Sequence, residues 1–276
     1  MGRKTGIILL LLQLVVDPLK SASDNYPAGA GHAALGNVGV MMPGFWSVSQ
    51  NQAGLGFYHH LSAGVHHENR FLLPEFGYSM IGMTIPVTTA TLGTSFSSFG
   101  YRQYNESKLG LGIGKAFHEK FSAGVQLDYL YIHSSSEDGN SSAIAAEAGI
   151  MAQPVKNFYV GFHVFNLTAS KYKARAGEEL IPVLIRFGFG YYYDDRLFLG
   201  VETEKDLEIS QALFRSGLEY RITRGIYART GIELSGSVHH SFGLGFAFGR
   251  IKADISFMHH QLLGYTPYLS LSCQFR

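Results

Sequence analysis

The stretch Val238–Phe248, which reads VHHSFGLGFAF, contains the pattern that decides the fold of this chain. Large and small side chains alternate along it, with Phe242, Leu244, Phe246 and Phe248 on one face and Ser241, Gly243, Gly245 and Ala247 on the other. Alternation with a period of two is typical of a β-strand, because successive side chains point to opposite sides. The stretch therefore predicts a strand with one bulky apolar face and one face of very small residues.

Residues 121–131 repeat this division. One face carries Phe121, Val125, Leu127, Tyr129 and Tyr131, and the other carries Ser122, Gly124, Gln126 and Asp128. In a soluble β-sandwich the face opposite the core would be rich in charge, whereas here small residues dominate it. An apolar exterior around a crowded interior is typical of a transmembrane β-barrel, and we predict this all-β, antiparallel fold.

Alternation along the chain predicts fourteen strands, an even number as in single-chain bacterial barrels. Four connections are tight, at 118–119, 194–195, 223–224 and 249–250, and two are long, at 134–141 and 169–181. If the first strand rises from the periplasm, the four tight turns lie on the periplasmic side and both long loops lie outside. The expected strands are 58–69, 76–87, 90–101, 104–117, 120–133, 142–153, 157–168, 182–193, 196–204, 210–222, 225–234, 238–248, 251–260 and 265–275.

The composition agrees with a single membrane unit. Charged residues make up 16% of the chain, below the ~25% usual for soluble domains. The net charge is +1, so there is no basic field to attract nucleic acid. The single cysteine, Cys273, excludes an internal disulfide and no cysteine pattern suggests a zinc site.

The N-terminus has the features of a secretory signal peptide. Arg3 and Lys4 precede the apolar run 7–16, and small residues follow at 21–23. We expect a signal peptide over 1–23, cleaved near residue 22 or 23; the alternative is a buried helix of the mature domain. A secretory signal peptide followed by a transmembrane β-barrel predicts a location in the cell outer membrane, in contact with its lipid.

Several passages resemble the family of fourteen-stranded barrels that includes the fatty-acid transporter FadL and the PorV and PorQ barrels of type IX secretion in Bacteroidota. The stretch 31–56 resembles the opening of that family, with Asn51, Gln52, Ala53, Gly54 and Leu55 in place of an Asn-Pro-Ala-Gly-Leu motif, so that Gln52 replaces the proline. Further similar segments are 161–167, 182–191 and 218–275. The resemblance implies that residues 24–56 form a plug in the lumen and that 57–276 form the barrel. Trp46 and Phe45, with almost no charge around them, agree with a packed segment.

In the eighth to thirteenth predicted strands, every second residue should face the lumen, and these inward positions include both acidic and basic residues. Because opposite charges on adjacent strands pair, we expect a network that holds wall and plug together; a polar conduit is the alternative. The residues are Arg186, Glu202, Glu204, Arg215, Glu219, Arg229, Glu233, Lys252 and Asp254.

Histidines occur in four adjacent pairs, at 59–60, 66–67, 239–240 and 259–260. The last three pairs belong to neighbouring strands near the extracellular rim, where imidazoles bind metals or sense pH. Only one histidine of each pair can face a given cluster, and we favour interfacial polar residues, with no metal site. No local motif selects a nucleophile with its base, and GLGIGK at 110–115 lacks the spacing of a phosphate loop. We therefore expect no catalytic residues and no cofactor.

The resemblance and the short loops lead us to expect a non-enzymatic accessory or docking subunit of an outer-membrane secretion or assembly machine, with another outer-membrane protein as partner. The alternative is a FadL-like channel for small hydrophobic molecules, in which the apolar plug residues Met41, Met42, Phe45 and Trp46 would line the ligand site. Asn51 is assigned either to ligand binding or to the plug. An outer-membrane hydrolase, with a Ser or Asp within hydrogen-bond reach of a rim histidine, is a third hypothesis. A channel predicts an apolar cavity beside the plug, whereas an accessory subunit predicts a sealed lumen and an exposed docking patch.

Overall fold

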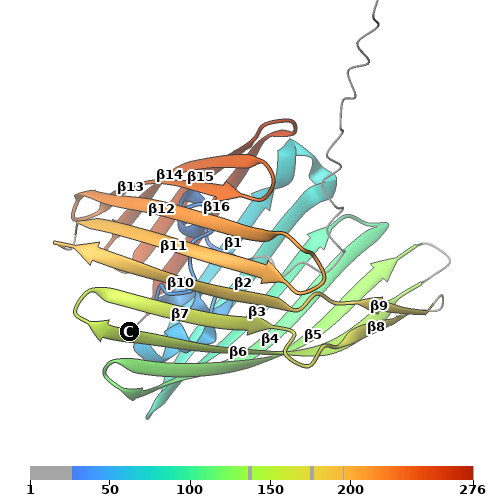
Figure 1. Ribbon diagram of the computed structural model, residues 1–276, viewed down its shortest axis with the longest axis horizontal. Helices are drawn as coiled ribbons and strands as arrows, with labels where there is room; N and C mark the ends of the chain where they lie inside the picture. Colours follow the sequence, from blue (N-terminus) through green and yellow to red (C-terminus); the bar gives the residue numbers. More distant parts are fainter. Residues whose placement is uncertain (1–26, 136–138, 175–176, 195, 276) are drawn as a thin grey trace, which may run out of the picture.

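The chain forms a closed barrel of fourteen antiparallel strands, which confirms the predicted fold class (Figure 1). The computed structural model describes residues 27–135, 139–174, 177–194 and 196–275, so the predicted signal peptide lies outside the described residues. The barrel strands are β1 (Ser62–Asn69), β2 (Gly77–Val87), β3 (Ala90–Gly100), β4 (Tyr104–His118), β5 (Phe121–Ser134), β6 (Ser141–Val155), β7 (Phe158–Phe165), β10 (Leu184–Tyr193), β11 (Leu197–Asp206), β12 (Ala212–Thr223), β13 (Ile226–Leu234), β14 (Val238–Phe248), β15 (Ile251–His260) and β16 (Gly264–Gln274). Neighbours along the chain pair with each other, β7 pairs with β10, and β1 pairs with β16 to close the wall.

Two segments differ from the sequence-based expectation. The first strand begins at Ser62 rather than at residue 58, because the chain leaves the lumen through the short 3-10 helix η2 (Gln52–Phe57) before it enters the wall. The connection 169–181, expected as a loop, contains the two-stranded hairpin β8 (Lys171–Ala174) and β9 (Gly177–Leu180). Tyr172 of this hairpin is buried against Leu130, Ile132 and Phe165, so apolar packing holds the hairpin against the wall.

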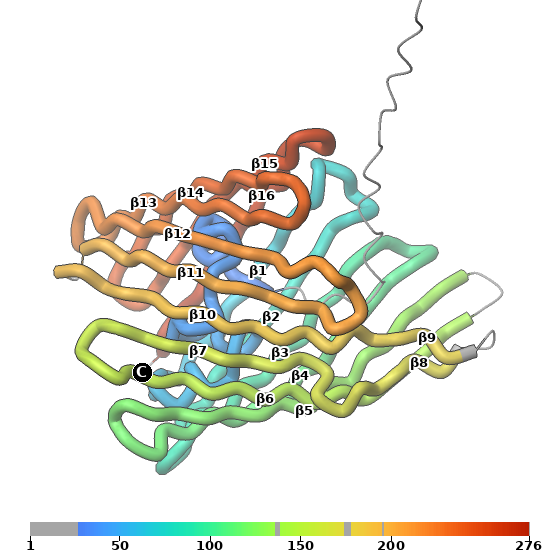
Figure 2. The backbone as a smooth tube through the Cα atoms, viewed as in Figure 1, coloured from blue at the N-terminus to red at the C-terminus, as the bar shows by residue number. Residues whose placement is uncertain are grey.

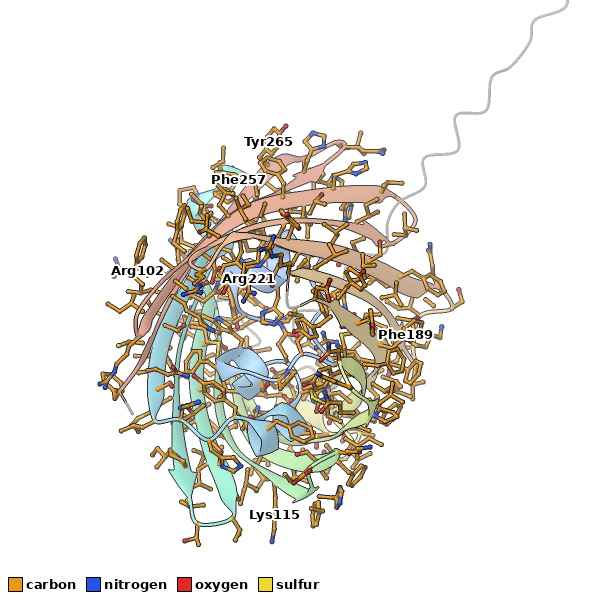
Figure 3. All side chains as sticks on the ribbon, turned by 90° about the vertical axis from the view of Figure 1, so that its left-hand side faces the viewer. Arg102, Lys115, Phe189, Arg221, Phe257 and Tyr265 are labelled. Atoms are coloured by element: carbon orange, nitrogen blue, oxygen red, sulfur yellow. The ribbon has the colours of Figure 1, made fainter. Side chains whose placement is uncertain are left out.

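The outer surface of the wall is apolar, as the alternation in β14 indicates. Phe242 is 50% exposed, whereas its neighbour Ser241 is 2% exposed. Figure 3 shows Phe189 on the outside of the ring of strands and Arg221 on its inside. A closed barrel leaves no unpaired strand edge, and an apolar exterior is stabilised in lipid. Within the described residues, no helix is long and apolar enough to cross a membrane.

The two ends of the barrel differ in their connections. Short turns join β4 to β5, β12 to β13 and β14 to β15 at one end, and the hairpin β8–β9 lies at the other. Short turns face the periplasm in barrels of this class, so we call this end the periplasmic end. The opposite rim carries the 3-10 helices η3 (Arg70–Leu72) and η4 (Pro74–Phe76) in the connection from β1 to β2.

Residues 27–61 run through the lumen and are called the plug here. They contain the helix α1 (Ala30–Ala34), the 3-10 helix η1 (Phe45–Val48) and η2. Helix α1 packs against β13 to β16, and η2 packs against β3 to β6, so the plug contacts opposite parts of the wall. The tube in Figure 2 shows this segment in blue within the barrel.

Candidate functional site

The plug backbone lies directly against luminal glycines of the wall. A Cβ atom added at Gly231 would lie 2.1 Å from the carbonyl carbon of Leu35, and one added at Gly161 would lie 2.2 Å from the carbonyl oxygen of Val40. No other residue type fits at such distances without displacement of the plug. The plug therefore packs against the face of small residues that the sequence predicted.

Asn51 fixes the middle of the plug. Its side-chain amide donates to the carbonyl oxygen of Val40 at 2.7 Å and to those of Ile150 and Phe162 in the wall at 3.2 and 3.3 Å. Its Oδ1 accepts a hydrogen bond from the backbone N–H of Ala53. Asn51 is fully buried, so it anchors the plug and does not line open space.

Glu202 joins the wall charges to the plug. Its carboxylate accepts hydrogen bonds from the backbone N–H groups of Gly39 and Val40 at 2.8 and 2.9 Å. Its other oxygen lies 2.6 Å from Arg186 and 3.1 Å from Arg215. A buried carboxylate with several charge-assisted partners is strongly held, and it supplies acceptors to plug N–H groups that no helix or strand satisfies.

The charge network continues around the wall in two groups. Arg215 also pairs with Glu204 at 2.9 Å and with Glu233 at 3.0 Å. Towards the periplasmic end, Arg229 pairs with Glu219 at 2.5 Å and with Asp254 at 2.6 Å. Of the nine residues projected into the lumen, eight thus lie in these pairs, and Lys252 stands apart at the periplasmic mouth.

A second buried network was not predicted from the sequence. Lys108 lies 2.9 Å from Glu147, and Glu147 accepts from the Gln52 amide of the plug at 2.8 Å and lies 3.0 Å from His163. Asp128 adjoins this group at 3.9 Å from Lys108. All four wall residues occupy inward positions of β4 to β7, so extending the alternation to these strands would have found them.

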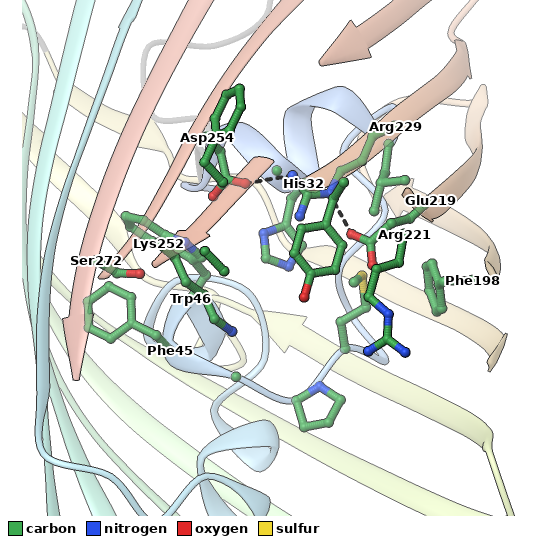
Figure 4. A pocket seen from close by; sticks show the side chains of 18 of the residues that line it. His32, Phe45, Trp46, Phe198, Glu219, Arg221, Arg229, Lys252, Asp254 and Ser272 are labelled. Atoms are coloured by element: carbon green, nitrogen blue, oxygen red, sulfur yellow. Dashed lines mark hydrogen bonds and ion pairs between the residues drawn. The ribbon is translucent and has the colours of Figure 1, made fainter. Parts of the chain in front are cut away.

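A cavity of about 530 Å³ lies between the plug and the periplasmic end of the wall (Figure 4). Its plug side includes Met42, Phe45 and Trp46, three of the predicted ligand residues. Its wall side includes the turn residues Arg196 and Arg250, so the cavity lies at the periplasmic mouth. Met41 does not line it, because this side chain is fully buried with Val38, Val40 and Phe198.

His32 of helix α1 also lines the cavity. Its Nδ1 is buried and has no hydrogen-bond partner among the residues that the structure describes. Burial, followed by the nearby positive charges of Arg229 and Arg186, lowers the pKa of His32 from 6.5 to about 3. The imidazole is therefore neutral at physiological pH.

The rim histidines do not form one cluster. The rings of His239 and His260 lie 4.5 Å apart, whereas His66 is buried among Trp46, Tyr78 and Tyr268. In the described part of the chain, no group of three His, Cys, Asp or Glu side chains has the geometry of a metal site. The exposed pair 59–60 lies at the opposite, periplasmic end.

One rim histidine contacts a serine, as the hydrolase hypothesis requires. Ser237 Oγ lies 2.9 Å from His239 Nε2, and His239 Nδ1 lies 3.5 Å from Glu233 Oε1. The order of groups is that of a nucleophile, a base and an orienting acid. The other oxygen of Glu233 already accepts from Arg215 at 3.0 Å, which offsets the negative charge that would stabilise an imidazolium.

Taken together, the wall and the plug define a fourteen-stranded barrel of the outer-membrane class with a segment of its own chain in the lumen and a cavity beside that segment. No family model matches the sequence, and no curated protein matches it. Solved structures do match the fold, and they include barrels of the FadL type. This agrees with the predicted location in the outer membrane.

Three of these structures cover almost the whole chain. The CymD monoaromatic hydrocarbon channel superposes with a TM-score of 0.71 at 13% identity, over 92% of this chain and 99% of CymD. The toluene transporter TbuX of Ralstonia pickettii gives 0.67 at 10% identity, over 90% and 98% of the two chains. A FadL homologue of Pseudomonas aeruginosa gives 0.68 at 11% identity, also over 90% and 98%. At these identities the likeness establishes the fold.

The expected role as an accessory or docking subunit of a secretion machine is contradicted. The structural neighbours are channels and transporters, and the lumen contains a cavity where an accessory subunit was expected to be sealed. The physical reason for the error is that short loops and paired luminal charges describe the wall, whereas the cavity depends on the path of the plug. The protein partner expected with that role stays a prediction.

Proposed function

We propose that this protein is a non-enzymatic channel for small hydrophobic molecules, with the cavity beside the plug as its binding site. The cavity carries the proposal: its volume lies within the ~300–1,000 Å³ typical of small-molecule sites, and aromatic side chains line it. The named activities of the structural neighbours, a monoaromatic hydrocarbon channel and toluene transporters, agree with this substrate class. The finer resemblance to PorV and PorQ of Bacteroidota stays a sequence-based prediction.

Gly44 offers a way to block the cavity without disturbing the plug. It lines the cavity, and a Cβ atom added there would meet no atom within 4 Å. Its backbone is extended, so any residue type adopts its conformation. A tryptophan at this position would occupy open space, whereas an alanine would leave most of the cavity free.

The test is uptake of naphthalene into vesicles whose outer leaflet is lipopolysaccharide and whose interior contains cyclodextrin as a trap. The purified protein should accelerate uptake, Gly44→Trp should abolish most of the acceleration, and Gly44→Ala should keep it. Uptake no faster than in protein-free vesicles would show that the proposed function is wrong. Equal rates for Gly44→Trp and the unmodified protein would show that the route does not pass through the cavity.

A further inference from the structure

We infer that the cavity selects aromatic acids, molecules with a planar ring and one acidic group, over neutral hydrocarbons of the same shape. The inference rests on the proposed function and names the substrate class of the same site. Five cationic and only two carboxylate side chains line the cavity, an excess of three positive charges. The cations are Arg196, Arg221, Arg229, Arg250 and Lys252, and the carboxylates are Glu219 and Asp254.

The excess of three charges remains after both carboxylates are paired. Arg229 pairs with both carboxylates, at 2.5 and 2.6 Å, and this group carries one net negative charge. Four cations lie outside the group, and one of them, Arg250, donates from Nη1 to the carbonyl oxygen of Phe275 at 2.8 Å. Arg196, Arg221 and Lys252 form no ion pair within the described ranges of the chain. A neutral hydrocarbon gives these charges nothing to pair with, whereas an acidic group does.

The free cations converge on the cavity from different strands. The backbone N–H of Arg221 donates to the carbonyl oxygen of Arg196 at 2.7 Å, so these two residues lie side by side at the ends of β12 and β11. Lys252 belongs to β15, and Figure 4 shows its side chain and that of Arg221 extending towards the same opening. An anion in this opening is accessible to more than one cation at the same time.

Aromatic rings provide the remaining surface. Tyr58, Tyr192 and Tyr227 are half-buried and line the cavity. Tyr227 lies directly opposite Arg221 in the strand register, so a ring surface and a free cation are adjacent. Flat rings stack on or contact the edge of other rings and gain more than burial alone. The site therefore matches an aromatic acid better than an aliphatic acid.

Trp46 makes binding measurable, because it is the only tryptophan of the chain and it lines the cavity. The full chain, in non-ionic detergent, would be titrated with 4-nitrobenzoate, whose nitroaromatic ring quenches tryptophan fluorescence. The matched neutral ligand is 4-nitrobenzamide, with the same ring and quenching group. Benzoate and octanoate, which do not quench, would be compared as competitors.

Two variants each remove one free cation, Arg221→Gln and Lys252→Gln, and Arg224→Gln is the matched control at an exposed turn position outside the cavity. We expect saturable quenching by nitrobenzoate that is at least tenfold tighter than that by nitrobenzamide. Each cavity variant should weaken nitrobenzoate binding about fivefold, the effect of a charge pair at ~4 Å in water. The control and nitrobenzamide binding should be unchanged, and benzoate should displace better than octanoate.

Equal affinities for nitrobenzoate and nitrobenzamide would overturn the preference for acids, as would unchanged nitrobenzoate binding in both cavity variants. Equal displacement by octanoate and benzoate would overturn the preference for aromatic ligands. The naphthalene uptake test separates these outcomes from the proposed function. If uptake remains sensitive to Gly44→Trp, the channel stands and only the ligand class is wrong.

Discussion

Glu202→Gln should release the plug from the wall without unfolding the barrel. Glu202 accepts two plug N–H groups and pairs with two arginines, all buried. Glutamine keeps the shape but turns two charge-assisted hydrogen bonds into neutral ones, a loss of about 1 kcal/mol each. Removal of one partner from a buried ion pair costs ~3–5 kcal/mol. Because Glu204 stays within 3.7 Å of Arg186, we expect the lower end for the ion pair, about 3 kcal/mol, and a total of about 5 kcal/mol.

The assay is urea titration with two signals. Fluorescence of Trp46 follows the plug, and far-ultraviolet circular dichroism follows the strands. In Glu202→Gln the fluorescence transition should move to lower urea while the circular dichroism transition stays in place. The control is Glu178→Gln, which makes the same change in the exposed ion pair with Lys171 and should move neither signal. A shift of less than about 1 kcal/mol in the fluorescence transition would refute the view that Glu202 anchors the plug.

Three further predictions concern the plug and the rim. Gly231→Ala should expose Trp46 to acrylamide, because the new Cβ would lie 2.1 Å from Leu35; unchanged quenching would contradict the close approach of plug and wall. The pKa of His32 is about 3 in the folded protein and 6.5 in the unfolded chain. The contribution of neutral His32 to plug stability is therefore complete above pH 6.5 and is lost as the pH falls towards 3. At pH 5 the loss should be about 2 kcal/mol in the Trp46 urea transition, and His32→Asn should remove this dependence. Ser237 should not be labelled by a fluorophosphonate, because Arg215 donates to Glu233 and offsets the negative charge that an orienting acid needs. Labelling of Ser237 that His239→Asn abolishes would instead support the hydrolase hypothesis.

The wall could be predicted from the sequence because each of its residues obeys one local rule. A side chain faces either lipid or lumen, and the alternation of Phe242 with Ser241 is enough to tell which. The same rule placed the charges around Arg215 in the lumen, and it would have found Glu147 had it been applied to β6. It failed at residues 58–61, which were assigned to the first strand but lie between the end of η2 and the start of β1.

The cavity could not be predicted in this way, because its position depends on the plug. The plug has no regular period: it contains a five-residue helix and two short 3-10 helices joined by irregular chain. Asn51 was assigned from the sequence either to ligand binding or to the plug, and in the structure its amide donates to three carbonyl oxygens. Two of these oxygens belong to the wall residues Ile150 and Phe162, 99 and 111 positions along the chain from Asn51. No local sequence pattern contains such distant partners, so it cannot tell whether a plug residue anchors the plug or lines open space.

The residue types on the luminal face match the physical requirements of the plug. Glycines at positions such as 161 and 231 let the plug backbone lie against the wall, but an irregular backbone brings N–H groups that must be paired when buried. Wall side chains such as Glu202 and Asn51 of the plug itself provide these partners, so the buried charges serve anchorage wherever the plug is present. At the periplasmic mouth the plug leaves space, and there Arg221 and Lys252 form no ion pair with a carboxylate of the described residues. The cations that do not hold the plug are therefore the ones placed to meet a ligand.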